Sequence, residues 1–273
     1  MPEVSIIIVS YNTKNLTLSC ISSVVKEGSK LSKEIIIVDN GSRDGSLESI
    51  AAIDTKKSEI PIRLIKNDEN LGFSKANNQG IKIAKGKYIL LLNSDTQVEK
   101  RAIIELIEFA EKNPEAGVVG PKLLNPDRTV QPSVFNLPTV SRAIQQYWLA
   151  KKRILDKYFP AGSEPVEVES LVMAAFLITP KALKKVGLLG ERYFMFYEDL
   201  DFCRRVRYAK LKVYYLPTAE VSHYHGASGK KLANEENQWR RLIPSSIIYH
   251  GRFKHYLLNF IIWSAQKWGK LSR

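Results

Sequence analysis

The sequence of 273 residues is poor in cysteine and has no long apolar run. Its two cysteines, Cys20 and Cys203, cannot form a disulfide framework and do not have metal-ligand spacing. Near the end, the nearly apolar stretch 256–265 is far shorter than the roughly 20 residues of a membrane-spanning helix. No charged-then-apolar leader precedes the first strand-like run. We therefore expect a cytoplasmic protein that does not cross a membrane.

Two common nucleotide-binding motifs are also missing. No G-x-G-x-x-G follows the first strand-like run, and G-x-x-x-x-G-K-[ST] does not occur, because GASGKK at 226–231 has the wrong spacing. These absences disfavour dinucleotide-dependent oxidoreductases and P-loop nucleotide triphosphatases.

Composition indicates a globular chain with an uneven charge. Hydrophobic residues make up 44% and charged residues 25%, which excludes disordered, collagen-like and coiled-coil proteins. The formal net charge is +13, of which residues 1–140 carry +1 and residues 141–273 carry +12. This excess indicates anionic partners for the second half of the chain.

The hydrophobic pattern predicts an α/β fold. Short runs rich in Ile, Val and Leu alternate with segments of helical spacing, and these runs occupy residues 4–11, 34–39, 62–66 and 88–95. The alternation is typical of a mostly parallel sheet flanked by helices, with ligands beyond the carboxyl ends of the strands. Further on, the pattern predicts helices over 99–112 and 144–159, strands over 117–120, 166–179 and 213–217, short helices from Pro180 and from Glu198, and a helical tail from about 234.

Two acids follow strand-like runs at the expected ligand-binding edge. Asp39 and Asp95 suit a nucleotide base or ribose and a divalent metal on its diphosphate. Alternatively, Asp39 is a turn or capping residue, and Asp95 caps the helix predicted from Glu99. The segment 67–81 places Gly72 in a loop and Asn77 on the first turns of a helix, where backbone amides can face a diphosphate. Its alternative is a glycine turn before an ordinary amphipathic helix.

The helix that opens with EDLD at 198–201 supplies a candidate general base. Asp199 borders the apolar stripe of this helix, and partial desolvation there would raise its pKa. Alternatively, Glu198, Asp199 and Asp201 only stabilise the positive start of the helix. For Asp201 we adopt this structural interpretation, with Arg205 as its i,i+4 ion-pair partner.

Histidines occur in two groups. His223 and His225 are expected in a loop directly after a strand, where a neutral imidazole could complete a metal site or simply be exposed. His250 and His255 lie among basic residues and are assigned to a basic surface.

Six segments, taken in order, resemble one family. They are SYN at 10–12, VDNGSRDGS at 38–46, ENLGFSKANNQGI at 69–81, LLNSDT at 91–96, FYEDLDFCRRV at 196–206 and VSHYHGAS at 221–228. Over roughly residues 3–230 the chain is similar to the inverting family-two glycosyltransferases with the GT-A fold, and most of all to their rhamnosyltransferase-like branch.

The resemblance implies roles for individual residues. Asp199, the second acid of the Glu198–Asp199 pair, would be the catalytic base. A divalent metal, Mg²⁺ or Mn²⁺, would be held by Asp95 and His223. The nucleotide-sugar site would comprise Tyr11, Thr13, Asp39, Gly72, Asn77, Asn93 and Asp95. Asn93 replaces the first acid of the family's Asp-X-Asp motif, as in this branch, and MAAFL at 173–177 lacks the glycine that usually opens the acceptor-side strand.

The resemblance also implies a reaction and partners. A sugar, with rhamnose from dTDP-rhamnose as the best choice, would pass with inversion from a nucleoside diphosphate to a hydroxyl of a lipid-linked or cell-envelope glycan. The catalytic GT-A domain would comprise residues 1–230, with a nucleotide-sugar half (1–125) and an acceptor half (126–230). A homodimer is also open, and no nucleic acid is expected as a partner.

The tail at 231–273 is expected to be helical, basic and aromatic. Residues 230–273 contain nine Lys and Arg against two Glu, and the tail is rich in Trp, Tyr and Phe. It is therefore expected to bind an anionic membrane surface at the inner face of the cell membrane. Alternatively, its aromatic residues pack against the catalytic domain or a second subunit.

Two other functions remain open at this point. A nucleotidyltransferase would need a Gly-rich basic loop after the first strand, which SYNTKN does not provide. A non-catalytic module that binds anionic polymers would explain the charge, but would leave Asp39, Asp95 and Asp199 without a role.

Overall fold

The computed structural model describes residues 1–53, 60–224 and 235–271. Its strands are β1 (Val4–Ser10), β2 (Lys33–Asn40), β3 (Ile62–Asn67), β4 (Tyr88–Asn93), β5 (Thr96–Val98), β6 (Ala116–Leu124), β7 (Val134–Phe135), β8 (Val166–Val168), β9 (Ser170–Leu171), β10 (Ala175–Ile178) and β11 (Lys212–His223). Its helices are α1 (Lys14–Lys26), α2 (Ser46–Ala51), α3 (Phe73–Ile83), α4 (Ala102–Lys112), α5 (Val140–Tyr147), α6 (Pro180–Val186), α7 (Glu198–Tyr208), α9 (Glu235–His250) and α10 (Arg252–Leu271).

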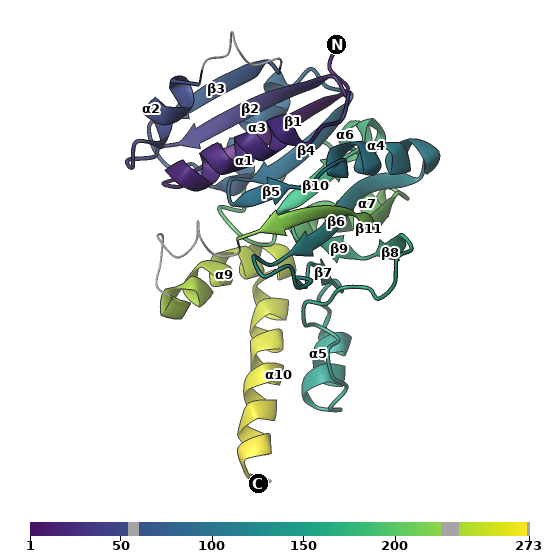
Figure 1. Cartoon of the computed structure of the whole chain (residues 1–273). Helices are drawn as coiled ribbons and strands as arrows, with labels where there is room; N and C mark the ends of the chain where they lie inside the picture. The colour runs from purple at the N-terminus through teal and green to yellow at the C-terminus, as the bar shows by residue number, and fades with distance from the viewer. Residues whose placement is uncertain (54–59, 225–234, 272–273) are drawn as a thin grey trace.

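One mixed sheet forms the centre of the molecule, with helices on both of its faces (Figure 1). Its strand order is β3-β2-β1-β4-β10-β6-β11-β5, with β8 also paired to β11. Strands β3, β2, β1 and β4 are parallel, and their register places Ser10 opposite Asp39 and Val9 opposite Asn93. The carboxyl ends of β1, β2 and β4 therefore meet at one edge, as the sequence predicted.

The core follows from the alternation of side chains along the strands. Ile6 and Ile8 of β1 belong to a buried cluster with residues of α1 and α4, whereas Ile7 between them belongs to a second cluster with residues of α3, α6 and α7. Because β1 and β2 are covered on both faces, their sequences are continuously apolar. This burial holds the strand ends rigidly at the edge where polar side chains follow.

The helix expected over 144–159 is much shorter than predicted. Helix α5 covers Val140–Tyr147, and the chain then turns, with positive φ at Ala150 and Arg153. The turn is stabilised because the Leu155 N–H donates to Gln146 Oε1 at 2.6 Å, and Tyr158 forms a β-bridge with Val134. Long-range pairing has thus overridden local helical spacing.

The strand expected over 166–179 is divided into β8, β9 and β10. Between β8 and β9, the Glu169 carboxylate pairs with Arg142 of α5 at 2.6 Å and accepts the Leu137 N–H at 2.7 Å. Residues 166–179 therefore contribute β8 and β10 to the main sheet and β9 to the small β7–β9 sheet. The other predicted elements are confirmed, although β11 extends to His223.

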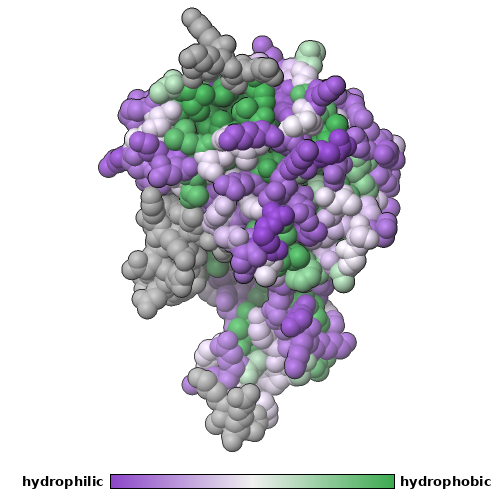
Figure 2. Space-filling view, viewed as in Figure 1, coloured by the Kyte–Doolittle hydropathy of each residue, from purple (hydrophilic) through white to green (hydrophobic). Residues whose placement is uncertain are grey.

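Helix α10 extends away from the body of the protein, with α5 beside it (Figure 1). The rings of Trp148 and Trp268 lie 6.3 Å apart where the two helices meet. In the same view, apolar and hydrophilic residues alternate over this projection (Figure 2). None of the described helices is long and apolar enough to cross a membrane. The expected domain boundary near residue 230 lies outside the described residues.

Candidate active site

A cavity of about 680 Å³ opens at the carboxyl ends of the parallel strands. Its walls come from three regions: the ends of β1, β2 and β4, the segment before and at the start of α7, and a third wall built by residues 135–157 and by α9 and α10. Seven of the residues that the sequence places at the site line this cavity. They are Tyr11, Gly72, Asn93, Asp95, Glu198, Asp199 and His223.

Asp39 lies buried at the end of β2, directly before Asn40, which lines the cavity. Its Oδ1 accepts the Ser42 N–H at 3.0 Å, so the expected turn geometry is present. Its Oδ2 is also buried and has no hydrogen-bond partner among the described residues. A turn role alone leaves this oxygen unexplained, because a buried polar atom ordinarily finds a donor. The N–H of a bound base would satisfy it.

Gly72 lies at the cavity and approaches the loop before α7. It has a φ of +88°, and a Cβ at this position would lie 2.7 Å from the carbonyl oxygen of Phe194. The next residue, Phe73, donates its N–H to the same carbonyl at 2.7 Å. Glycine is needed here both for the conformation and for this close approach.

Thr13 and Asn77 are buried but do not line the cavity. The Thr13 hydroxyl is 3.0 Å from that of Ser94 and 3.1 Å from that of Thr17. The Asn77 amide donates to the Phe73 carbonyl within α3 at 2.9 Å. In this conformation both side chains support the wall behind the cavity.

Asp95 and His223 face each other at the base of the cavity, although they come from distant parts of the chain. Asp95 Oδ1 lies 3.4 Å from His223 Nε2, and both residues are buried. The backbone N–H of Tyr224 donates to the Asp95 carbonyl at 2.8 Å. Asp95 is not a cap of the following helix, because α4 begins at Ala102 with Arg101 as its N-cap.

The surroundings of His223 determine which ring nitrogen faces Asp95. His223 Nδ1 is 2.7 Å from Gln131 Oε1, so an N–H on Nδ1 leaves the Nε2 lone pair directed toward the cavity. The expectation that His223 lies in a loop is wrong, since pairing of β11 with β5 and β6 extends the strand to this residue. His225 lies outside the described residues.

These two residues fit a divalent metal only if a ligand completes the coordination. The described residues contain no group of three His, Cys, Asp or Glu suited to a metal. A carboxylate oxygen and an imidazole nitrogen are, however, ligands that Mn²⁺ and Mg²⁺ accept, with the remaining positions filled by phosphate oxygens and water. The donor set therefore suits a metal that binds together with a diphosphate.

Glu198 and Asp199 open α7 and line the opposite wall. Burial, with the charge of Asp199, raises the pKa of Glu198 to about 8, and Glu198 Oε2 has no hydrogen-bond partner among the described residues. Burial also raises the pKa of Asp199 to about 6, opposed by the Leu200 N–H and by the charge of Lys157. Asp199 is thus ionised at neutral pH and basic enough to accept a proton.

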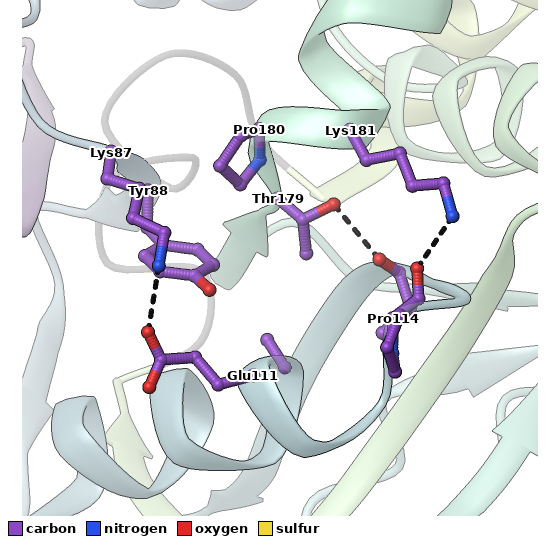
Figure 3. Close-up of a pocket in the computed structure, with 9 residues that line it drawn as sticks. Lys87, Tyr88, Glu111, Pro114, Thr179, Pro180 and Lys181 are labelled. Atoms are coloured by element: carbon purple, nitrogen blue, oxygen red, sulfur yellow. Dashed lines mark hydrogen bonds and ion pairs between the residues drawn. The ribbon is translucent and has the colours of Figure 1, made fainter.

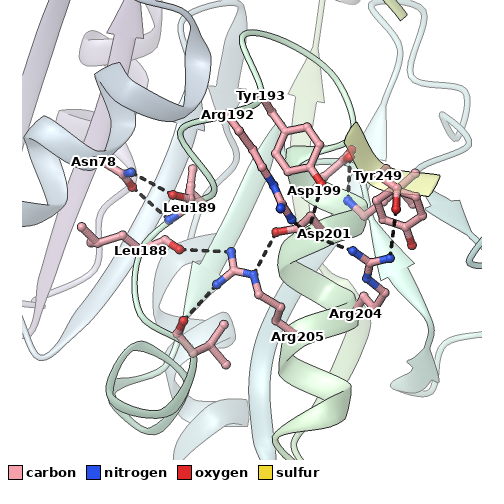
Figure 4. A network of polar contacts seen from close by, with 12 residues as sticks. Asn78, Leu188, Leu189, Arg192, Tyr193, Asp199, Asp201, Arg204, Arg205 and Tyr249 are labelled. Atoms are coloured by element: carbon pink, nitrogen blue, oxygen red, sulfur yellow. Dashed lines mark hydrogen bonds and ion pairs between the residues drawn. The ribbon is translucent and has the colours of Figure 1, made fainter. Parts of the chain in front are cut away.

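Asp201 faces away from this cavity and has a structural role (Figure 4). Its buried carboxylate is 2.9 Å from Arg205, 3.1 Å from Arg204 and 3.2 Å from Arg192. The predicted pair with Arg205 is confirmed. Arg204 also stacks 4.0 Å over the ring of Tyr249, so the network joins α7 to α9.

The sequence interpretation missed the third wall of the cavity. His250 was expected on a basic surface, but it lines the cavity with its ring 5.8 Å from that of Tyr197, and burial lowers its pKa to about 4. His255 is buried as well. Both expectations are wrong because α9 and α10 fold back onto the loop before α7. Lys157, Ser246, Leu258 and Ile262 also line this wall, and no sequence signal identified them.

A second hollow of about 330 Å³ lies at the opposite end of the strands (Figure 3). Its polar groups bind each other: Lys87 pairs with Glu111 at 2.9 Å, and Lys181 donates to the Pro114 carbonyl at 3.0 Å. We therefore place the functional site in the first cavity.

Comparison with known sequences identifies the family. The sequence profile described as Glycosyl transferase family 2 matches residues 5–163. The chain belongs to glycosyl transferase family 2. This glycosyltransferase is 30% identical over 212 residues to the N-acetylglucosaminyl-diphospho-decaprenol L-rhamnosyltransferase of Mycobacterium tuberculosis, covering 71% of this chain and 67% of the relative.

Solved structures share the fold of this glycosyltransferase. Crystal structures of GalNAc-T7 with UDP, GalNAc and Mn²⁺ and of S. aureus TarS residues 1–349 match with TM-scores of 0.64 and 0.58, each at 16% identity. The first match covers 82% of this chain and 44% of the other, and the second covers 95% and 69%. The expected GT-A class is confirmed, with the C-terminal helices present.

Proposed function

We propose that this glycosyltransferase moves a sugar from a nucleoside diphosphate sugar to a hydroxyl of a lipid-linked or cell-envelope glycan, with inversion at the anomeric carbon. The observation that carries the proposal is the arrangement of one cavity. Asp95 and His223 lie at its base and the candidate base Asp199 lies in its wall; Asp39, with its buried unpaired oxygen, does not line the cavity itself but directly precedes Asn40, which does.

Asp199 takes the proton of the acceptor hydroxyl while the hydroxyl oxygen attacks the anomeric carbon in line with the leaving diphosphate. The adjacent Glu198 holds its own proton at neutral pH, since burial keeps its pKa near 8, and so adds no second negative charge beside the base. Asp39 binds the base of the nucleotide. Asp95 and His223 hold a divalent cation, Mg²⁺ or Mn²⁺, which when bound neutralises charge on the departing diphosphate.

The choice of substrates rests on similarity. The Mycobacterium tuberculosis relative is named for transfer of L-rhamnose to N-acetylglucosaminyl-diphospho-decaprenol. We take dTDP-rhamnose as the donor and a lipid-linked glycan as the acceptor. Residues 1–230 then form the catalytic domain, with nucleotide and acceptor halves that meet at the cavity.

The C-terminal projection provides a surface for an anionic membrane. Phe253, Tyr256, Phe260 and Trp263 form one stripe along α10, with exposed fractions from 80% at Phe253 to 55% at Trp263. Helix α10 also carries Arg252, Lys254 and Lys267, and the Lys267 ammonium nitrogen lies 6.0 Å from the centre of the Trp263 ring. The loop that follows α5, the helix beside α10, carries Lys151, Lys152 and Arg153. Aromatic residues with flanking cations are typical of helices that lie in a membrane interface. We propose peripheral attachment to the inner face of the cell membrane by this surface.

A panel of nucleoside diphosphate sugars tests the function. Each sugar is incubated with Mn²⁺ or with excess chelator, and donor turnover and thermal shift are measured. We expect one donor to be turned over with metal and not with chelator, and Asp199→Asn to bind that donor with unchanged affinity while losing transfer. Full activity in excess chelator would remove the metal from the proposal, and transfer by Asp199→Asn within about tenfold of wild type would remove the base.

A further inference from the structure

Lys157 is the single Lys or Arg among the described residues that line the cavity. The carboxyl groups that line the cavity are those of Asp95, Glu198 and Asp199. Lys157 has no ion-pair partner among the described residues, and its ammonium nitrogen lies 5.3 Å from the centre of the Phe135 ring. The surrounding walls lower its pKa, and the charge of Asp199 opposes that effect. Lys157 is itself exposed at the cavity and is influenced by the charge of Asp199, so its ammonium group is accessible to an anionic group of a ligand in the cavity.

The position of Lys157 places that anion on the acceptor side. Asp95 and His223, which suit the donor diphosphate, belong to the ends of β4 and β11 in the main sheet. Lys157 instead follows α5, and its neighbour Phe135 belongs to the separate β7–β9 sheet. Its electrostatic partner is Asp199, the group that must contact the acceptor hydroxyl.

Apolar side chains continue the wall around Lys157. Leu155 and Ala143 line it from the α5 side, and Leu258 and Ile262 line it from α10. Helix α10 carries its exposed aromatic stripe on other residues, so the cavity wall and the surface proposed for membrane contact are two faces of the same helix. An anion bound at Lys157 therefore shares the cavity with apolar side chains of the α5 region and of α10.

We propose that Lys157 binds a phosphate of the acceptor, and that the acceptor hydroxyl belongs to the sugar attached to a lipid diphosphate. Lys157 is then a specificity-determining residue that selects phosphate-linked over neutral glycosides. This inference rests on the proposed function, because it assigns the acceptor side of the same cavity. A phosphate could come from either substrate, so the test must separate donor from acceptor.

Calorimetry with farnesyl diphosphate tests the assignment. The full chain is first saturated with Mn²⁺ and whichever of dTDP or UDP binds more tightly, so that the nucleotide site is filled. We expect farnesyl diphosphate to bind this complex and farnesol to bind at least about tenfold more weakly. Lys157→Met should weaken farnesyl diphosphate about tenfold or more, and Lys157→Arg should retain most of the affinity because the positive charge remains.

Lys100→Met is the control, since Lys100 is an exposed lysine outside the cavity and outside the surface proposed for membrane contact. It should bind both ligands like wild type. Unchanged farnesyl diphosphate affinity in Lys157→Met, or no binding to the nucleotide-saturated wild type, would overturn the inference. An equal loss of nucleotide affinity in Lys157→Met would also overturn it and would place the lysine at the donor. If neither dTDP nor UDP binds the wild-type protein, that result would instead contradict the proposed function itself.

Discussion

At the scale of single residues, the site depends on how differently burial affects its carboxylates. Asp199 and Glu198 are neighbours on one helix turn, yet burial raises the pKa of Asp199 to about 6 and that of Glu198 to about 8. Burial thus raises the pKa of both carboxyl groups, and the charge of Asp199 raises that of Glu198 further, which disfavours a second negative charge on the pair.

The pH dependence of transfer follows from the raised pKa of Asp199. Because the base acts in its ionised form, kcat/KM should fall as the pH decreases below about 6 and should reach a plateau above it. Steady-state rates between pH 4.5 and 8 measure this profile, with unfolding monitored in the same buffers. A rate that is constant from pH 7 down to pH 5 in folded protein would contradict the assignment.

Asp39→Ala should weaken nucleotide binding. The substitution removes the buried Oδ2, which is proposed to accept an N–H from the base, so the free nucleoside diphosphate and the sugar donor should lose equal affinity. We expect a loss of about tenfold, measured by calorimetry, since hydrogen bonds to charged groups contribute about 1.5–3 kcal/mol. Asp44→Ala, in the same loop, is the control. Equal nucleotide affinity in wild type and Asp39→Ala would leave Asp39 with its turn role alone.

At the scale of elements, the cavity depends on how the loop before α7 is held. Gly72 at the start of α3 contacts the Phe194 carbonyl, and Ser245 of α9 donates its hydroxyl to the Met195 carbonyl at 2.8 Å. Two distant parts of the chain, the start of α3 and α9, thus hold one loop, and Glu198 and Asp199 directly follow it. Phe196 and Tyr197 have positive φ, so this packing also maintains an unfavourable backbone conformation directly before α7.

Asp201→Asn should lower the free energy of unfolding by about 3 kcal/mol, because it breaks a buried ion-pair network. We expect the low end of the usual cost, since the three arginines reach solvent and stay hydrated when the carboxylate is lost. Urea unfolding measures this loss. Glu167→Gln is the matched control: Glu167 pairs with Arg207 and Lys212 at the surface, so its loss should cost less than about 1 kcal/mol. Equal stabilities of the two variants would show that the network of Asp201 does not anchor α7.

At the scale of the whole molecule, the positive charge is uneven along the chain, and exposed aromatic residues lie along the C-terminal projection. The first half of the sequence is nearly neutral, and the projection of α5 and α10 carries exposed aromatic residues beside cations. This asymmetry would orient the protein on an anionic surface with the third wall of the cavity toward the lipid.

Flotation with anionic liposomes tests that orientation. The triple variant Tyr256→Ser, Phe260→Ser, Trp263→Ser should lose most of its binding at low salt, because it removes the apolar contact and keeps every positive charge. The matched control replaces Val25, Leu64 and Ile83, which are exposed elsewhere, with serine. Deletion of residues 250–273 should abolish binding. Wild type that does not float, or deletion protein that floats equally well, would contradict the membrane role.

Much of this arrangement could be predicted from the sequence because its signals are local. Continuous Ile and Val runs require strands buried on both faces, and parallel strands bring their carboxyl ends to one edge, so Asp39 and Asp95 had to share it. The acids at the start of α7 likewise lie where helix-start preferences place them. The order of the six motifs was enough to indicate the family.

The third wall of the cavity was decided by tertiary structure alone. Residues 144–159 have helical spacing, yet pairing of Tyr158 with Val134 ends the helix at Tyr147 and brings Lys157 into the cavity. His250 lies in a basic segment, yet stacking of Arg204 on Tyr249 draws α9 against α7 and turns His250 inward. Such contacts join residues tens of positions apart, and their free energy exceeds the local preferences that a sequence pattern reports. The sequence by itself therefore determined that the parallel strands bring Asp39 and Asp95 to one edge of the sheet, whereas packing between distant segments decided what closes the cavity there.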